Sequence, residues 1–277
     1  MNIKKISVIS IIFVFTFFMN IHTTFAITPI SEEKYQGIDV SNWQGYINYE
    51  QVKKAGIEIV YIKASEGNNY KDPYLEINYE NAKNNGLKVG FYHFLTAINT
   101  EEAEEQARFF SSVISKKIPD CKLVLDYEVF GGVPATLINQ IARSFMEETK
   151  RLTNKDVILY SDLYNSRTVF SKELAEDYEL WIADYTNSQN LENSQSNWNN
   201  WIGWQYSNMG RISGINGYVD RDIFTKEILL NEKTEIPENN NSHNDTSTGK
   251  RYYVVKPGDT LSEIALQYGT TVNEIVS

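Results

Sequence analysis

The chain of 277 residues is long enough for one large domain with a small appendage, and its content of 42% hydrophobic and 13% aromatic residues excludes a disordered protein. Its formal net charge of −10 argues against a nucleic-acid partner, because acidic side chains repel phosphates. Cys121 is the single cysteine, so no internal disulfide can form.

The amino terminus has the pattern of a signal peptide. Two lysines precede an apolar run over residues 6–21, which is shorter than the ~20 residues that a membrane span needs. Residues 24–26, Thr-Phe-Ala, form the small-x-small pattern of a cleavage site. We therefore expect residues 1–26 to be removed on export; an uncleaved anchor is the alternative. The remaining 24 basic and 36 acidic side chains give a net charge of −12.

Eight short runs rich in Val, Ile, Tyr and Trp predict β-strands, and several are apolar throughout, which is typical of strands buried on both faces. They are Gly37–Ser41, Ile57–Ala64, Leu87–Leu95, Lys122–Glu128, Val157–Ser161, Tyr178–Asp184, Trp201–Tyr206 and Tyr218–Phe224.

Helical patterns separate the first six of these runs. They are Tyr49–Ala55, Tyr74–Asn84, Glu101–Lys117, Ala135–Leu152 and Leu163–Ala175. Residues 185–200 are polar and 207–217 hold three glycines, so the last two connections are expected to be loops. Eight strands and about five helices predict an α/β fold, an irregular β/α barrel with helices missing on one side.

A polar segment divides the chain. Residues 231–250 contain no aromatic residue and one aliphatic residue, Ile236, which predicts a flexible linker. The barrel is therefore expected over residues 35–228, and a small second unit over residues 251–277.

Acidic side chains lie where predicted strands end, which is where active sites form in β/α barrels. Asp39 lies near the end of the first strand, Asp126 and Glu128 close the fourth, and Asp184 ends the sixth. Side chains alternate along a strand, so Asp126 and Glu128 point the same way, with Cα atoms ~6.5 Å apart. Crowding raises the proton affinity of one carboxylate, giving the acid and the anion that glycosidic cleavage needs.

Two other interpretations of these acids remain open. They are either solvated or paired with lysines such as Lys63, or they bind a metal ion. His93 is the only nitrogen ligand near the predicted strand ends, since the other histidine left after processing, His243, lies in the linker. We therefore expect no metal and no cofactor. Aromatic residues flank the acids and suit sugar stacking, although core packing explains each one singly.

Five motifs occur in order along the chain. They are Gly37-Ile38-Asp39-Val40-Ser41-x-Trp43, Tyr61-Ile62-Lys63-Ala64-Ser65-Glu66-Gly67, Gly90-Phe91-Tyr92-His93-Phe94, Asp126-Tyr127-Glu128 and Trp181-Ile182-Ala183-Asp184-Tyr185. The set resembles glycoside hydrolase family 25, the N-acetylmuramidase lysozymes, over residues 35–228.

The resemblance implies hydrolysis of the β-1,4 bond between N-acetylmuramic acid and N-acetylglucosamine in bacterial peptidoglycan, without a metal. With the signal-peptide pattern, we expect a secreted, cell-wall-associated protein, and we expect it to be a monomer. It makes Glu128 the general acid and Asp126 its partner, which either attacks the anomeric carbon or orients the substrate's acetamido group. Asp39 and Asp184 resemble the remaining acids of the cleft. The expected substrate contacts are Tyr61, Tyr92, Trp181, Tyr185 and Gln205.

Two more acids, Asp220 and Asp222, lie on the last predicted strand. Asp220 either orders the floor of the cleft or forms an ion pair with Arg221.

The tail resembles the start of a lysin motif (LysM), a module that binds peptidoglycan and chitin. It holds Tyr253-Val254-Val255-Lys256-Pro257-Gly258-Asp259-Thr260-Leu261. Thr260 with Glu263, and Thr271 with Glu274, have the spacing of helix capping boxes. The sequence stops at Ser277 within the second helical pattern, so we expect a partial module. Two other functions remain: a non-catalytic wall-binding protein, and a metal-dependent peptidoglycan deacetylase.

Overall fold

The computed structural model describes residues 26–186, 191, 194–230 and 260–261. The chain divides into two units, Met1–Glu232 and Lys233–Ser277. The signal peptide predicted for residues 1–26, apart from Ala26, the linker predicted for 231–250 and nearly all of the predicted LysM module lie outside the described residues. No helix in the described ranges combines the length and the apolar character needed to cross a membrane.

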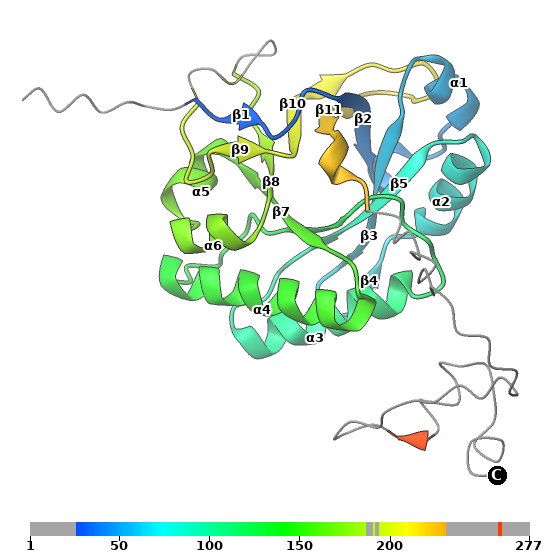
Figure 1. Ribbon diagram of the computed structural model, residues 1–277. Helices are drawn as coiled ribbons and strands as arrows, with labels where there is room; N and C mark the ends of the chain where they lie inside the picture. Colours follow the sequence, from blue (N-terminus) through cyan, green and yellow to red (C-terminus); the bar gives the residue numbers. More distant parts are fainter. Residues whose placement is uncertain (1–25, 187–190, 192–193, 231–259, 262–277) are drawn as a thin grey trace, which may run out of the picture. The chain divides into compact units, whose positions relative to one another are not determined.

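The first unit is a closed barrel of eight strands, as predicted (Figure 1). Around the ring these are β2 (Lys34–Val40), β11 (Val219–Thr225), β10 (Gly203–Gly210), β8 (Leu180–Ala183), β7 (Val157–Asp162), β6 (Leu123–Asp126), β5 (Lys88–Phe94) and β3 (Ile59–Glu66). Pairing of β2 with β3 closes the ring. The short β4 (Tyr70–Lys71) extends β3, and β1 (Thr28–Pro29) pairs with β9 (Asn200–Trp201) outside the barrel.

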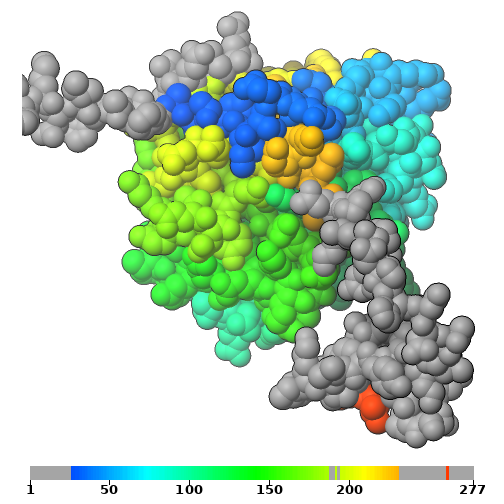
Figure 2. All heavy atoms as spheres, viewed as in Figure 1, coloured from blue at the N-terminus to red at the C-terminus, as the bar shows by residue number. Residues whose placement is uncertain are grey.

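One strand of the barrel runs against the others. β11 is antiparallel to both of its neighbours, β10 and β2, whereas the other neighbouring pairs in the ring are parallel. Figure 2 shows the segment that contains β2, in blue, side by side with the segment that contains β11, in orange. As a result the start of β11, not its end, lies at the edge where the parallel strands end. Asp220 there pairs directly with Asp39 of β2.

The helices cover the outside of the barrel (Figure 1). They are α1 (Tyr49–Lys54), α2 (Leu75–Asn84), α3 (Thr100–Ile114), α4 (Ala135–Thr153), α5 (Leu163–Thr168) and α6 (Lys172–Asp177), with single 3₁₀ turns η1 (Asn42–Gln44) and η2 (Lys226–Ile228). In the described part of the chain, the connections from β8 to β10 and from β10 to β11 contain no helix, as expected.

The single helix predicted over residues 163–175 is wrong, because two short helices occupy this stretch. Ser171 begins the second helix, since its side chain accepts a hydrogen bond from the backbone N–H of Leu174. Between the two helices, Phe170 is buried in the core. Burial of this ring and the new cap explain why the helical pattern does not continue.

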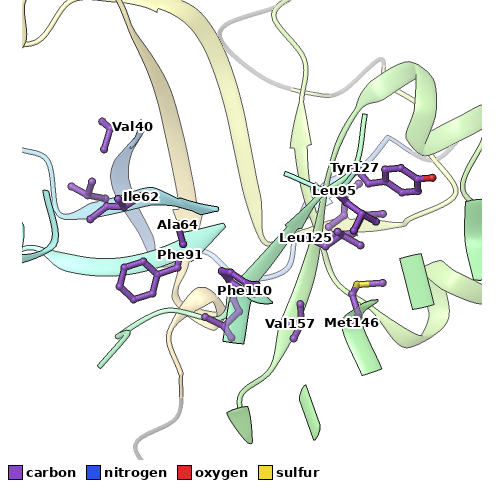
Figure 3. Packing of buried hydrophobic residues seen from close by; sticks show 14 of the residues in the cluster. Val40, Ile62, Ala64, Phe91, Leu95, Phe110, Leu125, Tyr127, Met146 and Val157 are labelled. Carbon is purple, nitrogen blue, oxygen red and sulfur yellow. The ribbon is translucent and has the colours of Figure 1, made fainter. Parts of the chain in front are cut away.

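Alternating strand residues divide the core into two layers. One set faces the helices: Figure 3 shows Val40, Ile62, Phe91 and Leu125 from the strands in the same cluster as Phe110 of α3 and Met146 of α4. The other set fills the barrel and consists of Ile59, Tyr61, Cys121, Val124, Ile158, Tyr160, Trp181, Ala183, Ile202, Phe224 and Ile228.

Glycine makes room for the large rings inside the barrel. A Cβ atom on Gly90 would lie 2.1 Å from the ring of Tyr61, and one on Gly37 would lie 2.3 Å from the ring of Phe224. The ring centroids of Tyr61 and Phe224 are 5.2 Å apart, and that of Trp181 lies 4.8 Å from Tyr61. These three rings form a packed floor, so side chains on the inner face beyond them are directed to one end of the barrel.

Candidate active site

A cavity of about 220 Å³ opens at the end of the barrel where the parallel strands finish. Asp39, Tyr92, Val124, Asp126, Glu128, Tyr160, Trp181, Tyr185, Gln205 and Asp220 line it. Seven of these were expected as catalytic or substrate-binding residues. The cavity therefore brings four carboxyl groups together beside aromatic rings, a lining suited to a sugar.

Asp126 and Glu128 follow the alternation expected of one strand. Leu123, Leu125 and Tyr127 face the helices, whereas Val124 and the two acids reach the cavity. Asp126 is buried and Glu128 is exposed, so Glu128 forms the outer part of the pair.

Burial and crowding raise the proton affinity of both acids. Burial raises the pKa of Asp126 well above its usual range, and the negative charge of Glu128 raises it further. Glu128 as a whole residue is exposed, but its carboxyl group reaches into the cavity, and partial loss of solvent there raises its pKa, with added effects from the charges of Asp162 and Asp220. The pair therefore retains a proton at a pH where isolated carboxyl groups are ionised.

A lysine ion pair does not explain these acids. Lys63 Nζ lies 2.6 Å from Glu66 Oε2, and its ammonium group lies over the ring of Phe94. Its charge lowers the pKa of Asp126, but as a smaller effect than burial. Asp126 Oδ1 is buried and, among the described residues, has no hydrogen-bond donor.

Gln205 holds Asp39 at the wall of the cavity. Its Nε2 donates to Asp39 Oδ2 at 2.7 Å, and its Oε1 accepts from the hydroxyl groups of Tyr160 at 2.8 Å and Tyr185 at 2.5 Å. The two hydroxyl donors fix the orientation of the amide, so the N–H group faces the carboxylate. Burial and the charge of Asp220 raise the pKa of Asp39, and the hydrogen bond from Gln205 lowers it.

Asp220 lies on the wall of the cavity, and the ion pair with Arg221, one of its two predicted alternatives, is not formed. The guanidinium group of Arg221 lies over the ring of Tyr206, 5.7 Å from its centroid, rather than against Asp220. Burial raises the pKa of Asp220 to about 6. The weak sequence signal for this residue was its place on the last strand; the reversed direction of β11 brings it to the cavity.

The structure does not bring Asp184 to the cavity. Its Oδ1 accepts hydrogen bonds from the backbone and hydroxyl of Thr186, and its Oδ2 accepts one from Ser194. Asp184 lies two and four residues after Ile182 and Leu180, whose side chains face the helices, so its side chain points the same way. Trp181 and Ala183 face inward. The placement of Asp184 in the cleft is therefore corrected: it braces the loop after β8.

Tyr61 is also placed differently from the expectation. It is fully buried in the barrel floor, and its hydroxyl donates to the carbonyl of Lys122. Its ring points into the barrel but lies too deep to line the cavity, so the expected substrate contact is not shown. Val124 and Tyr160 were not identified from the sequence, although both have the inward parity of their strands.

His93, the one histidine considered as a metal ligand, lies outside the cavity. Its Nδ1 accepts from Ser65 Oγ at 2.8 Å, while its Nε2 donates to Gln106 Oε1 at 3.2 Å. Burial lowers its pKa to about 3, so the ring is neutral. Within the residues that the structure describes, no group of three or more His, Cys, Asp or Glu side chains could hold a metal ion.

Comparison with known proteins agrees with this geometry. Residues 38–215 match the model of glycosyl hydrolases family 25, and residues 253–277 match the LysM domain. The chain is 36% identical over 200 residues to the autolytic lysozyme of Clostridium acetobutylicum, covering 70% of this chain but only 57% of that protein.

The matches to two further relatives cover a larger share of those proteins' own length. The chain is 36% identical over 209 residues to lysozyme M1 of Streptomyces globisporus, covering 72% of this chain and 70% of that one. The crystal structure of the bacterial lysozyme from Streptomyces coelicolor matches with a TM-score of 0.59 at 33% identity, covering 70% of this chain and 93% of that chain. The chain belongs to glycosyl hydrolases family 25, and it carries a LysM match after the barrel.

Proposed function

We propose that this protein is a muramidase that hydrolyses the β-1,4 bond between N-acetylmuramic acid and N-acetylglucosamine in bacterial peptidoglycan. The observation that carries the proposal is the pair of Asp126, at the end of β6, and Glu128, two residues beyond it, which line one cavity with two further carboxyl groups. The relatives named as lysozymes support the choice of glycan.

Glu128 is the general acid in this proposal. It lies at the mouth of the cavity, where it donates its proton to the glycosidic oxygen as the bond from that oxygen to the anomeric carbon breaks. The free Oδ1 of Asp126 accepts the acetamido N–H of the bound sugar, which favours the ionised form of Asp126 and leaves the shared proton on Glu128. The anion then stabilises the positive charge that develops on the sugar ring.

Asp126 acts in one of two ways after this point. It either bonds to the anomeric carbon or holds the acetamido group while its carbonyl oxygen attacks that carbon. Trapping with a fluorinated sugar substrate distinguishes direct attack from participation of the acetamido group. The protein is denatured after incubation with this substrate and analysed by mass spectrometry, and a covalent adduct on Asp126 supports direct attack.

The remaining groups of the cavity bind and orient. Asp39 and Asp220 supply negative charge beside the sugar, and the rings of Tyr92, Trp181 and Tyr185 form its apolar walls. The proposal includes export through the signal peptide at residues 1–26, action at the cell wall as a monomer, and added wall binding by residues 251–277 beyond a flexible linker at 231–250.

Product analysis tests the function. The purified protein is incubated with peptidoglycan, the new reducing ends are reduced with borohydride, and the fragments are analysed by mass spectrometry. We expect the new ends on muramic acid, in equal yield with and without EDTA. Ends on glucosamine would make the protein a glucosaminidase, activity lost with EDTA would favour the deacetylase, and an intact glycan would favour a wall-binding protein.

A further inference from the structure

Asp184 lies directly after β8 and is buried, although its carboxyl group does not line the cavity. Its backbone is held by β10. The N–H group donates to the carbonyl of Gln205 at 3.1 Å, and the carbonyl accepts from the indole N–H of Trp204, also at 3.1 Å. A buried carboxyl group outside the cavity has to be stabilised by hydrogen bonds, and these bonds show what it holds in place.

The side chain of Asp184 joins the two ends of the loop that follows β8. Its Oδ1 accepts from the backbone N–H of Thr186 at 3.0 Å and from the hydroxyl of the same residue at 2.6 Å, as in an Asx turn. Its Oδ2 accepts from the hydroxyl of Ser194 at 2.6 Å, ten residues further along the chain. Ser194 is buried, and its carbonyl accepts from the N–H of Ile27 at 3.3 Å, so this anchor is itself fixed.

Tyr185 lies between the two residues that these bonds hold. Its exposed fraction is 46%, yet its hydroxyl donates to Gln205 Oε1 at 2.5 Å. The amide of Gln205 donates in turn to Asp39 at the cavity wall. A half-exposed side chain in a loop loses conformational entropy when one rotamer is selected. A backbone fixed on both sides of Tyr185 reduces this cost, because it directs the ring toward Gln205.

We propose that Asp184 is a positioning residue that holds the hydroxyl of Tyr185 against Gln205. The oriented amide of Gln205 then fixes Asp39 at the cavity wall. Asp184 therefore acts from outside the cavity, and it is needed for its two acceptor oxygens rather than for its negative charge. The effect on turnover rests on the proposed muramidase function; the placement of Tyr185 does not.

Two substitutions of Asp184 distinguish an acceptor from a charge. In Asp184→Asn the amide oxygen keeps both bonds to Thr186, and the amide N–H donates to the hydroxyl of Ser194, which can also accept. We expect this variant to turn over close to the wild-type rate. Asp184→Ala loses these acceptors, and kcat should fall about threefold to tenfold, as for the loss of a hydrogen bond. A loss in Asp184→Asn as large as that in Asp184→Ala would overturn the proposal, because the charge would then be essential.

A double-mutant cycle with Tyr185→Phe tests the route. Once the hydroxyl of Tyr185 is removed, Asp184→Ala should lower kcat little further, so the two losses are not additive. Tyr160→Phe is the matched control, since its hydroxyl reaches the same oxygen of Gln205 from β7. Its loss should add to that of Asp184→Ala. Additive losses for Asp184→Ala and Tyr185→Phe would contradict a shared route.

NMR tests the placement of Tyr185 without turnover, in protein labelled with ¹³C at the hydroxyl-bearing ring carbon of tyrosine. The signal of Tyr185 is assigned from its absence in Tyr185→Phe. We expect it unmoved in Asp184→Asn but shifted in Asp184→Ala toward the signal of an exposed tyrosine such as Tyr46.

An unmoved signal in Asp184→Ala would refute the inference. If that variant does not fold, Ser194→Ala replaces it, since it removes one bond to Asp184 and should shift the same signal. No shift in Ser194→Ala would then refute the inference. A wild-type protein that shows these shifts in its variants but cleaves no glycan would refute only the proposed function.

Discussion

The amide nitrogen of Gln205 lies 2.7 Å from Asp39 Oδ2, joining β10 to β2 across the buried side of the cavity. Gln205→Glu replaces this N–H donor with an acceptor while keeping the shape of the side chain. We expect kcat to fall about tenfold to a hundredfold at pH 7, since a hydrogen bond to a charged group is lost. The deficit should shrink at acid pH, where the new carboxyl group regains a proton. A pH-independent deficit in steady-state kinetics would argue against this role.

Glu128→Gln removes the proton donor of the proposed reaction. We expect kcat on peptidoglycan to fall about a hundredfold to ten-thousandfold, the usual contribution of general acid catalysis. The thermal midpoint should not fall, because the change removes a carboxyl group whose pKa is raised by burial. Glu147→Gln on the exposed face of α4 is the matched control and should lyse cell walls normally. Near-normal turnover by Glu128→Gln would remove this residue from the mechanism.

Asp220 makes stability depend on pH. Its pKa rises from an ordinary 3.8 to about 6 on folding, so its stabilising contribution is present below pH 4 and is lost as the pH rises through 6. Asp220→Asn should therefore increase the free energy of unfolding at pH 7 by about 1–3 kcal/mol, with little change at pH 4. Urea denaturation at the two pH values measures this, and a less stable variant at pH 7 would contradict the assigned cause.

Gly90 leaves space for the ring of Tyr61 in the barrel floor. Gly90→Ala should reduce the free energy of unfolding by about 3 kcal/mol or more, because the new methyl group would overlap the ring. Adding Tyr61→Leu creates room, so the double variant should be more stable than Gly90→Ala alone. Independent, additive losses in urea denaturation would show that the two positions do not compete for this space.

Much of the barrel was predictable because each strand carries its own signal. Runs of Val, Ile and aromatic residues located all eight strands, and the spacing of Asp126 and Glu128 indicated one shared face. The same alternation would have excluded Asp184, which follows Leu180 and Ile182 toward the helices. The prediction for Asp184 was wrong because it used only the position of this acid at the end of a strand. It did not consider to which face of the sheet the side chain points.

Other features depend on closure of the barrel and have no local signal. The bond from Tyr160 to Gln205 joins strands 45 residues apart in sequence, and nothing near either residue specifies it. The reversed direction of β11 likewise became visible only from its pairing with β10 and β2. Because of this reversal, the first inward acid of that strand, rather than the last, reaches the cavity.

The aromatic floor of the barrel closes the reaction chamber from beneath. Tyr61, Trp181 and Phe224 fill the space under the carboxyl groups, so solvent has access from one direction alone. In the proposed reaction, the water that completes hydrolysis therefore enters through the opening by which the released sugar departs. Departure of the first product and arrival of water are thus consecutive events, and a slow-leaving sugar would delay the second half of each turnover.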